Sequence, residues 1–364
     1  MSFAFSERVR AALAPPRYLA LPLSGIDIST SGVKAVRLVE SPHGLILGEN
    51  AQVRLPLGVY TDGEIIDRAA IAGALVSVAR AAEISAANVA LPESKSYLFE
   101  ASAAGAKKEE WRVAVEQHLD ELVPLPPPET AFDIVGVGQD AQGNERIAGI
   151  GFARRVVDDT LSIFDEAGID VRALEGEPFA MARALIPVGD TSTVLIIDVG
   201  KTTTKMAIVT NRIPRFATTI GIGGHALTLA VQKHFGVTEA EARKVKAERG
   251  IVPAPGNEDY LAAMLSTISA IRDEISRRLS YWQEKAVVSG HEPVSRVILA
   301  GGNASVRGLP EYLEGVLRIP VSAGDVFTNL ASRDTWIPEL DYTESLAYAT
   351  AIGLALRDVV EPYA

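Results

Sequence analysis

Two stretches of the chain, GIDISTSGVKAVRL at Gly25 to Leu38 and IIDVGKTTTKMAIV at Ile196 to Val209, follow one pattern. In each stretch an apolar run reaches an aspartate, passes through small hydroxyl-bearing residues and resumes as a second apolar run. Asp27 in the first stretch corresponds to Asp198 in the second. Apolar runs bounded by turn residues are typical of strands, so the sequence predicts an aspartate-bearing hairpin in each half.

Two matching hairpins indicate a duplicated domain with a cleft between its halves, although one such aspartate alone would be ordinary turn chemistry. Lys34 follows the first turn as Lys205 follows the second. Backbone amides and hydroxyls of the two turns would donate hydrogen bonds to phosphate oxygens. The donor residues are Ser29, Thr30, Ser31, Lys201, Thr202 and Thr203. The aspartates would repel phosphate unless a hydrated Mg²⁺ ion lay between, since this ion keeps waters and takes few carboxylates.

Composition limits the class of protein and of partner. A chain of 364 residues exceeds the ~250 residues at which single cores stop growing, so we expect two or three domains. The net charge of -11 argues against binding to phosphate backbones or anionic lipid, and no nucleic-acid partner is expected. The sequence has no cysteine, which excludes disulfides and thiolate sites, and its five histidines show no metal-ligand spacing.

Strand-like and helix-like patterns alternate along the chain, which favours an α/β fold. The apolar stretch from Ser345 to Leu356 is far shorter than the ~20 residues of a spanning helix, so no transmembrane segment is predicted. The first residues, MSFAFSERVRAALAPP, carry charges where a signal peptide needs an apolar run, and we expect a tail with a short helix.

The rhythm changes between residues 94 and 153, which predicts an inserted subdomain. SYLFEAS and AFDIVGVG alternate like half-exposed strands, and KKEEWRVAVEQHLDELV between them predicts one helix. The proline-rich PLPPPE should end that helix, because proline lacks the amide donor and favours extended backbone before it.

Two further elements are candidates for a site. In LAGGNAS, Gly301 and Gly302 end a buried strand and would let a nucleoside ring lie against bare backbone. In EGEPFAMARAL, Glu177 opens a helix. A P-loop is excluded although GKT occurs at Gly200, because its first glycine would have to stand where the chain has Leu195.

The order of these motifs resembles the actin-like ATPase superfamily, which includes actin, sugar kinases, heat-shock chaperone ATPases and FtsA. Within it the likeness is closest to the PilM family of type IV pilus assembly. It rests on the first hairpin together with HLDELVPLPPPETAFDIV, DEISRRLSYW, ILAGGNASVRGLPEYLE and YATAIGLALR, and spans roughly Gly25 to Arg357.

The resemblance implies an actin-like ATPase fold of duplicated ribonuclease H-like domains, with the inserted subdomain of the FtsA and PilM group. The expected division is 1–23 for an N-terminal tail, 24–93 for subdomain 1A with the first phosphate hairpin, 94–153 for inserted subdomain 1C, 154–187 for the return to 1A, 188–223 for subdomain 2A with the second phosphate hairpin, 224–294 for subdomain 2B, and 295–364 for subdomain 2A with the adenosine motif and closing helix.

The resemblance also implies ATP or ADP with Mg²⁺ in the central cleft. The matching positions are Asp27, Ser29, Thr30 and Ser31 in the first hairpin, Asp198, Gly200, Lys201, Thr202 and Thr203 in the second, Gly301, Gly302 and Asn303 in the adenosine turn, and Gly224, Glu241 and Lys244 or Lys246 on the flanking helices.

Roles follow from the same likeness. Asp27 and Asp198 would hold Mg²⁺ through water, and Glu177 resembles the acid near the attacking water in some relatives. EAEARKVK fits the family pattern in two registers, which leaves two candidate lysines. Lys201 stands where many relatives have a small residue, so it either contacts phosphate or partly fills the site.

The function implied is a cytoplasmic ATP-binding scaffold or switch, at most a slow ATPase, located at the inner membrane through its partners. It would bind the cytoplasmic N-terminal tail of PilN in a groove around residues 94–153, act with other pilus inner-membrane and motor components, and form a homo-oligomer or ring. Two alternatives stay open. They are an FtsA-like division filament, although ALRDVVEPYA is short and acidic, and a small-molecule kinase, although no base for a second substrate is evident.

Overall fold

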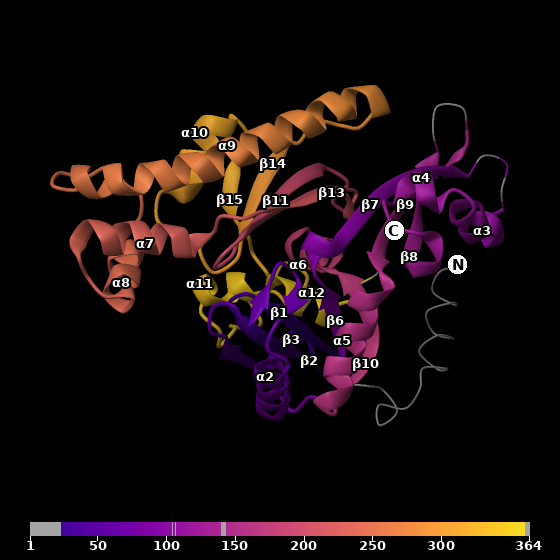
Figure 1. Ribbon diagram of the computed structural model, residues 1–364, viewed down its shortest axis with the longest axis horizontal. Coiled ribbons are helices and arrows are strands. Elements are labelled where there is room, and N and C mark those ends of the chain that lie inside the picture. Colours follow the sequence, from indigo (N-terminus) through magenta and orange to yellow (C-terminus); the bar gives the residue numbers. More distant parts are fainter. Residues whose placement is uncertain (1–22, 104, 106, 140–142, 361–364) are drawn as a thin grey trace.

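A computed structural model describes residues 23–103, 105, 107–139 and 143–360 (Figure 1). The predicted N-terminal tail and its short helix lie outside the described residues, apart from Leu23. Within those ranges, no helix is both long enough and apolar enough to cross a membrane.

The first lobe contains a five-stranded sheet in the order β10-β6-β1-β2-β3. Strands β1 (Leu23–Ser29), β2 (Gly32–Ser41) and β3 (Gly44–Arg54) form an antiparallel meander. Strand β6 (Ala86–Leu91) then pairs parallel to β1, and β10 (Asp170–Gly176) pairs parallel to β6.

The second lobe repeats this topology in the sheet β13-β12-β11-β14-β15. Strands β11 (Thr193–Val199), β12 (Thr204–Thr210) and β13 (Ile213–Ile220) are antiparallel, whereas β14 (Arg296–Ala300) and β15 (Val321–Ala323) extend the sheet in parallel from β11. The likeness of the two hairpins therefore reflects two copies of one strand order.

The two hairpins also share their register. Asp27 lies directly opposite Lys34 in β1 and β2, and Asp198 lies directly opposite Lys205 in β11 and β12. Facing residues of an antiparallel pair project from the same side of the sheet. Each hairpin therefore presents an aspartate and a lysine on one face.

Helices cover the outer face of the first sheet, and a small hairpin connects β3 to the first of these helices. Helix α2 (Arg68–Ala81) begins after Asp67, whose side chain accepts from the amide of Ala70. It follows the short strands β4 (Tyr60–Thr61) and β5 (Glu64–Ile65). The buried residues Ile71, Leu75, Val78, Ile163 and Phe164 join α2 and α5 (Arg154–Glu166) to the sheet in one core.

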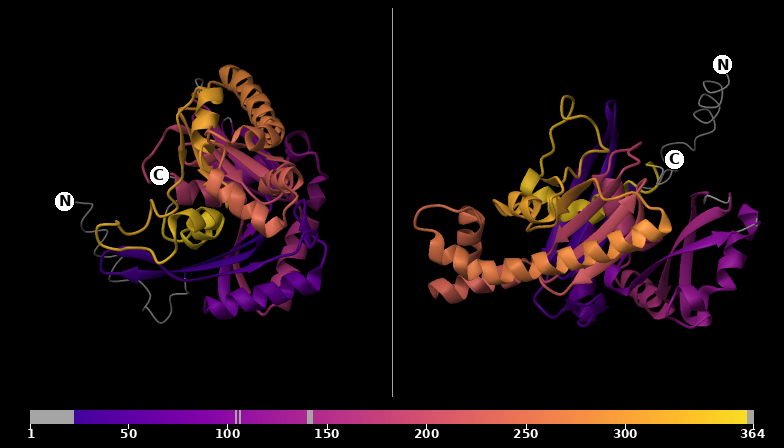
Figure 2. Two further views of the ribbon diagram at one scale, coloured as in Figure 1. Left: turned by 90° about the vertical axis from the view of Figure 1, so that its left-hand side faces the viewer. Right: turned by 90° about the horizontal axis from the view of Figure 1, so that it is seen from above.

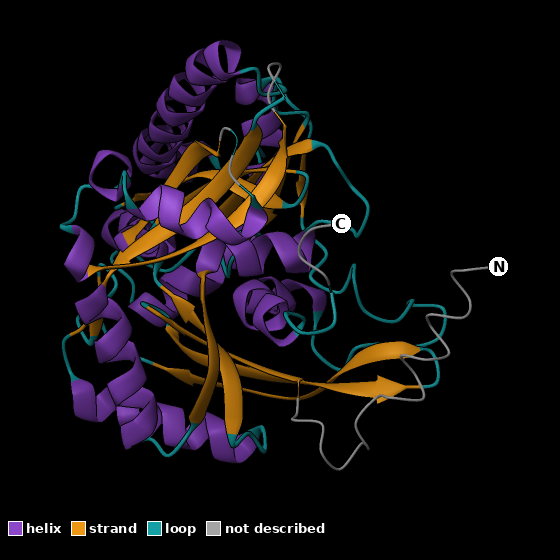
Figure 3. Ribbon diagram, turned by 90° about the vertical axis from the view of Figure 1, so that its right-hand side faces the viewer, coloured by secondary structure: helices purple, strands orange, loops and turns teal. Residues whose placement is uncertain are grey.

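Helices α6 (Glu177–Leu185) and α12 (Ala349–Ala355) lie between the two sheets (Figure 3). Helix α12 follows α11 (Tyr342–Ser345) and η5 (Leu346–Tyr348) in the chain. A Cβ at Gly353 would lie 1.8 Å from the carbonyl oxygen of Ala180, so glycine is required where the helices meet.

The second lobe carries α7 (Gly224–Phe235), α8 (Glu239–Arg249), α9 (Glu258–Ser289) and α10 (Leu309–Leu317). The long helix α9 runs along this lobe, and α7 and α8 lie at one end of the molecule (Figure 2). One face of α9 is buried, at Met264, Ile268, Ile271, Ile275 and Leu279.

The inserted subdomain is a three-stranded sheet in the order β7-β9-β8, at the opposite end from α8 (Figure 1). Its strands are β7 (Ser96–Ala103), β8 (Thr130–Gln139) and β9 (Glu145–Ala153). The connection between β8 and β9 lies partly outside the described residues. Short 3-10 turns η2 (Glu93–Lys95), η3 (Lys108–Glu110) and η4 (Pro127–Glu129) border these elements.

The prediction of one helix in this subdomain is wrong, because the structure has two, α3 (Trp111–Glu116) and α4 (Leu119–Leu122). The chain bends at Gln117 and His118. The bend lets Val115 and Leu119 both pack against the sheet residues Phe99 and Ile147. Tertiary packing on a short sheet thus overrides the helical period.

Candidate functional site

A cleft of about 560 Å³ lies between the lobes and brings most predicted residues together. Predicted site residues that line it are Asp27, Ser29, Thr30, Ser31, Glu177, Asp198, Gly200, Lys201, Thr203, Gly224, Gly301, Gly302 and Asn303. The paired hairpins therefore face one shared space.

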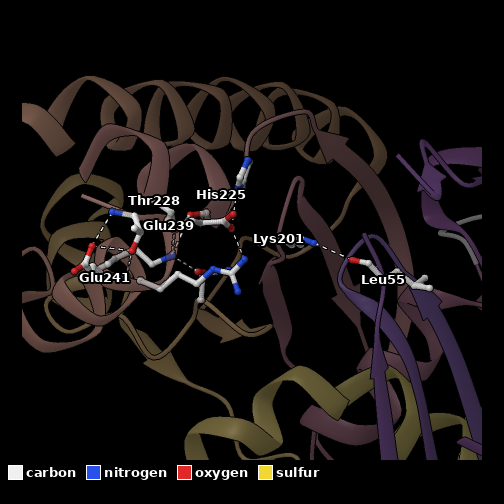
Figure 4. Close-up of polar contacts among 11 residues, drawn as sticks. Leu55, Lys201, His225, Thr228, Glu239 and Glu241 are labelled. Atoms are coloured by element: carbon white, nitrogen blue, oxygen red, sulfur yellow. Dashed lines mark hydrogen bonds and ion pairs between the residues drawn. The ribbon is translucent and has the colours of Figure 1, made fainter. Parts of the chain in front are cut away.

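Three predicted residues do not line the cleft. Thr202 lies in the turn between two lining residues. The carboxylate of Glu241 accepts from the amide of Thr238 at 2.8 Å, in the capping box at the start of α8 (Figure 4). Lys244 is 77% exposed, near Glu248. Of the two candidate lysines, the structure places Lys246 in the cleft.

Lys246 joins three elements at one end of the cleft. Its Nζ donates to Asn303 Oδ1 at 2.8 Å, to the carbonyl of Gly224 at 3.0 Å and to Thr228 Oγ1 at 3.1 Å. Burial lowers the pKa of Lys246 to about 8. The side-chain amide of Asn303 also donates to the carbonyl of Gly200 at 2.9 Å, which ties the adenosine turn to the second hairpin.

Glycines make the close approaches at this end possible. Gly301 has a φ of +89°, and a Cβ there would lie 2.0 Å from Asp198 Oδ1. A Cβ at Gly224 would lie 2.0 Å from Asn303 Oδ1. At Gly302 the nearest atom is 3.8 Å away, on Ala347. The two glycines predicted to border the nucleoside therefore differ. Gly301 packs against Asp198 of the second hairpin, whereas Gly302 borders open space.

The first hairpin is organised by a lysine that the sequence prediction did not include in the site. Lys34 is 3% exposed, and its Nζ donates to Ser29 Oγ at 3.3 Å and to Ser31 Oγ at 3.1 Å. Asp27 is also buried, and its Oδ1 has no hydrogen-bond partner among the described residues. A buried acceptor without a partner is costly, which makes this oxygen a candidate for contact with a ligand.

The second hairpin places a lysine among carboxylates. Lys205 Nζ lies 2.5 Å from Glu177 Oε2. Burial opposes the charge of Lys205, but Glu177, Asp198 and Asp27 outweigh burial and raise its pKa. Burial raises the pKa of Glu177 to about 7 and also raises that of Asp198. Lys205 therefore lies among three acids, and the charge of Lys34 also acts on one of them, Asp198.

The donor set fits a hydrated divalent ion better than a directly ligated one. Within the described ranges, no group of three His, Asp or Glu side chains could hold a metal ion. Asp27 and Asp198 both line the cleft beside the hairpin hydroxyls. Mg²⁺ is commonly bound in this way, with one or two carboxylates, several waters and phosphate oxygens.

Sequence reasoning missed a buried acid beside Glu177. Glu93 is 4% exposed, its amide donates to Glu177 Oε2 at 3.3 Å, and Thr219 donates to its carboxylate. Burial raises the pKa of Glu93. No pattern marks Glu93, because only the fold brings the end of β6 to α6. Lys34 and Lys205 did carry a signal, the matched positions opposite the aspartates.

A second cavity of about 480 Å³ lies between the inserted subdomain and the first lobe. We call it the insert groove, lined mainly by the apolar residues Leu91, Ala131, Phe132, Ile134, Val135, Ala148, Ile150, Phe152, Val157, Leu174 and Phe179. Arg183, which also lines it, is buried and donates to both carboxylate oxygens of Glu175, at 2.7 and 2.5 Å. Helix α6 thus carries Glu177 in the cleft and Phe179 in the insert groove.

Comparison with solved structures shows the same fold elsewhere. A chain of a PilM-PilN type IV pilus biogenesis complex is 20% identical, covers 92% of this chain and 98% of its own length, and has a TM-score of 0.73. MreB5 of Spiroplasma citri bound to AMPPNP is 15% identical over 95% of this chain and 98% of its own, with a TM-score of 0.55. The ethanolamine utilization protein EutJ from Carboxydothermus hydrogenoformans is 17% identical over 94% and 91%, with a TM-score of 0.52.

These likenesses confirm the predicted actin-like ATPase fold. A family model described as type IV pilus assembly protein PilM matches residues 25–359. Because that match covers nearly the whole chain, this protein belongs to the PilM family of type IV pilus assembly proteins.

Proposed function

We propose that this chain is an ATP-binding scaffold of the type IV pilus machinery, which holds MgATP between its lobes and the cytoplasmic tail of PilN in the insert groove. The observation that carries the nucleotide part is the pair of hairpins of equal register, which face one cleft of about 560 Å³. The AMPPNP of the MreB5 structure supports a nucleotide in this fold.

Each end of the cleft would bind one part of the nucleotide. The hydroxyls and amides at Ser29–Ser31 and Gly200–Thr203 would donate to the phosphates, as turns of successive amides do. The nucleoside would lie against Gly302, beside Lys246. Asp27 and Asp198 would hold Mg²⁺ through water, and the ion would neutralise phosphate charge.

Hydrolysis would be slow in this arrangement. Glu177 is the candidate general base, but its carboxylate is already bound by Lys205 Nζ and by the amide of Glu93. A general base must also reach the proton that it removes. We propose that Glu177 mainly fixes the second hairpin, so that the protein acts as a nucleotide-dependent switch.

The partner site would be the insert groove. Its apolar lining and its place between the inserted sheet and α6 suit an extended apolar peptide, such as a short membrane-protein tail. The PilM-PilN complex among the structural neighbours supports PilN as this partner. Cytoplasmic location at the inner membrane, contact with other pilus components and a homo-oligomer or ring would follow from this assembly.

Calorimetry on the purified chain tests both parts. We expect MgATP to bind the wild-type protein, and Asp198→Asn to weaken binding when magnesium is present more than when it is chelated. We expect a synthetic PilN tail peptide to bind, and Phe179→Ala to weaken it. Leu161→Ala, an exposed apolar site on α5, is the matched control. Absence of nucleotide binding refutes the first part, and absence of peptide binding with and without ATP refutes the second.

A further inference from the structure

Lys201 lies at the tip of the second hairpin and contacts the first lobe directly. Its Nζ donates to the backbone carbonyl of Leu55 at 3.1 Å (Figure 4). Leu55 follows β3, and its own amide donates to the carbonyl of Ser31 in the first hairpin at 3.3 Å. One hydrogen bond from Lys201 therefore links the two hairpins across the entrance to the space between them.

The backbone of this turn is fixed, whereas the lysine side chain can change its partner. The amide of His225 donates to the carbonyl of Lys201 at 2.7 Å, and the amide of Gly200 donates to the carbonyl of Thr203 at 2.9 Å. Among the described residues, the carbonyl of Leu55 is the sole acceptor of Lys201 Nζ. A neutral carbonyl is a weaker partner for an ammonium than a phosphate oxygen is.

The other lysines of the cleft are committed elsewhere. Lys205 is bound by Glu177, Lys34 by the hydroxyls of the first hairpin, and Lys246 by Asn303 at the nucleoside end. Burial and then the charge of Arg243 lower the pKa of Lys201, whereas the charge of Glu239 raises it. Among the lysines that line the cleft, Lys201 is thus the one positioned to exchange its acceptor.

We propose that Lys201 is the residue by which this chain distinguishes a nucleoside triphosphate from a diphosphate. The terminal phosphate of a triphosphate, lying between the hairpins, would replace the Leu55 carbonyl as the acceptor of Lys201 Nζ. A diphosphate lacks this phosphate and would not make the contact. This inference rests on the proposed nucleotide site, and it assigns Lys201 to a specificity role rather than to filling the cleft.

The test compares affinities for Mg-AMPPNP and Mg-ADP by calorimetry in four proteins. We expect the wild type to prefer AMPPNP, and Lys201→Met to lower the AMPPNP:ADP affinity ratio at least about tenfold, or about 1.4 kcal/mol. Its affinity for ADP should change little. Lys201→Arg should keep the preference because it keeps the charge, and the exposed Lys233→Met should match the wild type.

Thermal unfolding without nucleotide checks that each variant is folded. The inference is overturned if Lys201→Met keeps the wild-type ratio, or if the wild type binds both nucleotides equally. In either case the proposed nucleotide site stands. If the wild type binds neither nucleotide, the proposed function fails as well.

Discussion

The buried ion pair of the second hairpin makes a strong prediction for Lys205→Met. Lys205 Nζ lies 2.5 Å from a carboxylate oxygen of Glu177, and the side chains of the two residues are 18% and 2% exposed. Asp198 and Asp27 also act on this lysine. Removing one partner of a buried pair leaves an uncompensated charge and typically costs about 3–5 kcal/mol. We therefore expect the free energy of unfolding to fall by about that amount.

The assay is urea unfolding at pH 7.5, followed by circular dichroism and by tryptophan fluorescence, to which Trp282, buried in the second lobe, contributes. Adding Glu177→Gln to Lys205→Met should recover part of the loss, because one of the stranded acids is then neutral. The coupling energy of this double-mutant cycle should be at least about 1 kcal/mol. Lys233→Met, at an exposed site, should change stability by less than about 0.5 kcal/mol. A loss below about 1 kcal/mol for Lys205→Met, or strict additivity in the cycle, would refute the reasoning.

Three further predictions follow from the same contacts. Lys246→Met should weaken adenine nucleotide binding about tenfold or more in calorimetry, because Lys246 binds Asn303 in the cleft. The exposed Lys244→Met should not weaken binding, and equal effects of the two variants would contradict the register observed for α8. Gly301→Ala should destabilise the fold by at least about 1 kcal/mol in thermal unfolding, because Gly301 has a positive φ and lies beside the Asp198 carboxylate. Gly302→Ala should have little effect, so similar melting temperatures for the two variants would contradict the prediction. The pKa of Glu177 is about 7 in the folded protein against an ordinary 4.5, so the folded state binds this proton more tightly than the unfolded state does. The free energy of unfolding should therefore fall as pH rises from 4.5 to 7, and Glu177→Gln should flatten that slope. An unchanged slope in the variant would show that this carboxyl is not the cause.

Much of the cleft could be predicted from the sequence because the fold repeats itself. A hairpin is a local structure, so the matching turns predicted the two aspartate-bearing hairpins, and the structure adds that Asp27 faces Lys34 and Asp198 faces Lys205. Gly301 was predicted to end its strand with bare backbone for a nucleoside, whereas in the structure a side chain there would meet Asp198.

Other features depend on contacts between distant segments. Glu93 enters the site only because β6 ends beside α6, a contact across 84 positions of the chain. The bond from Lys201 to Leu55 spans 146 positions. Helical period alone could not separate Lys244 from Lys246, because α8 is polar on most of its surface and packing against α7 decides which lysine turns inward.

The central claim is that the paired hairpins together hold the phosphates of a nucleotide. The most direct measurement is a crystal structure of this chain grown with AMPPNP and magnesium. We predict the β- and γ-phosphates between the turns at Ser29–Ser31 and Gly200–Thr203, with the adenosine against Gly302 and Lys246. A structure with nucleotide bound elsewhere, or with the two turns on separate ligands, would contradict the claim.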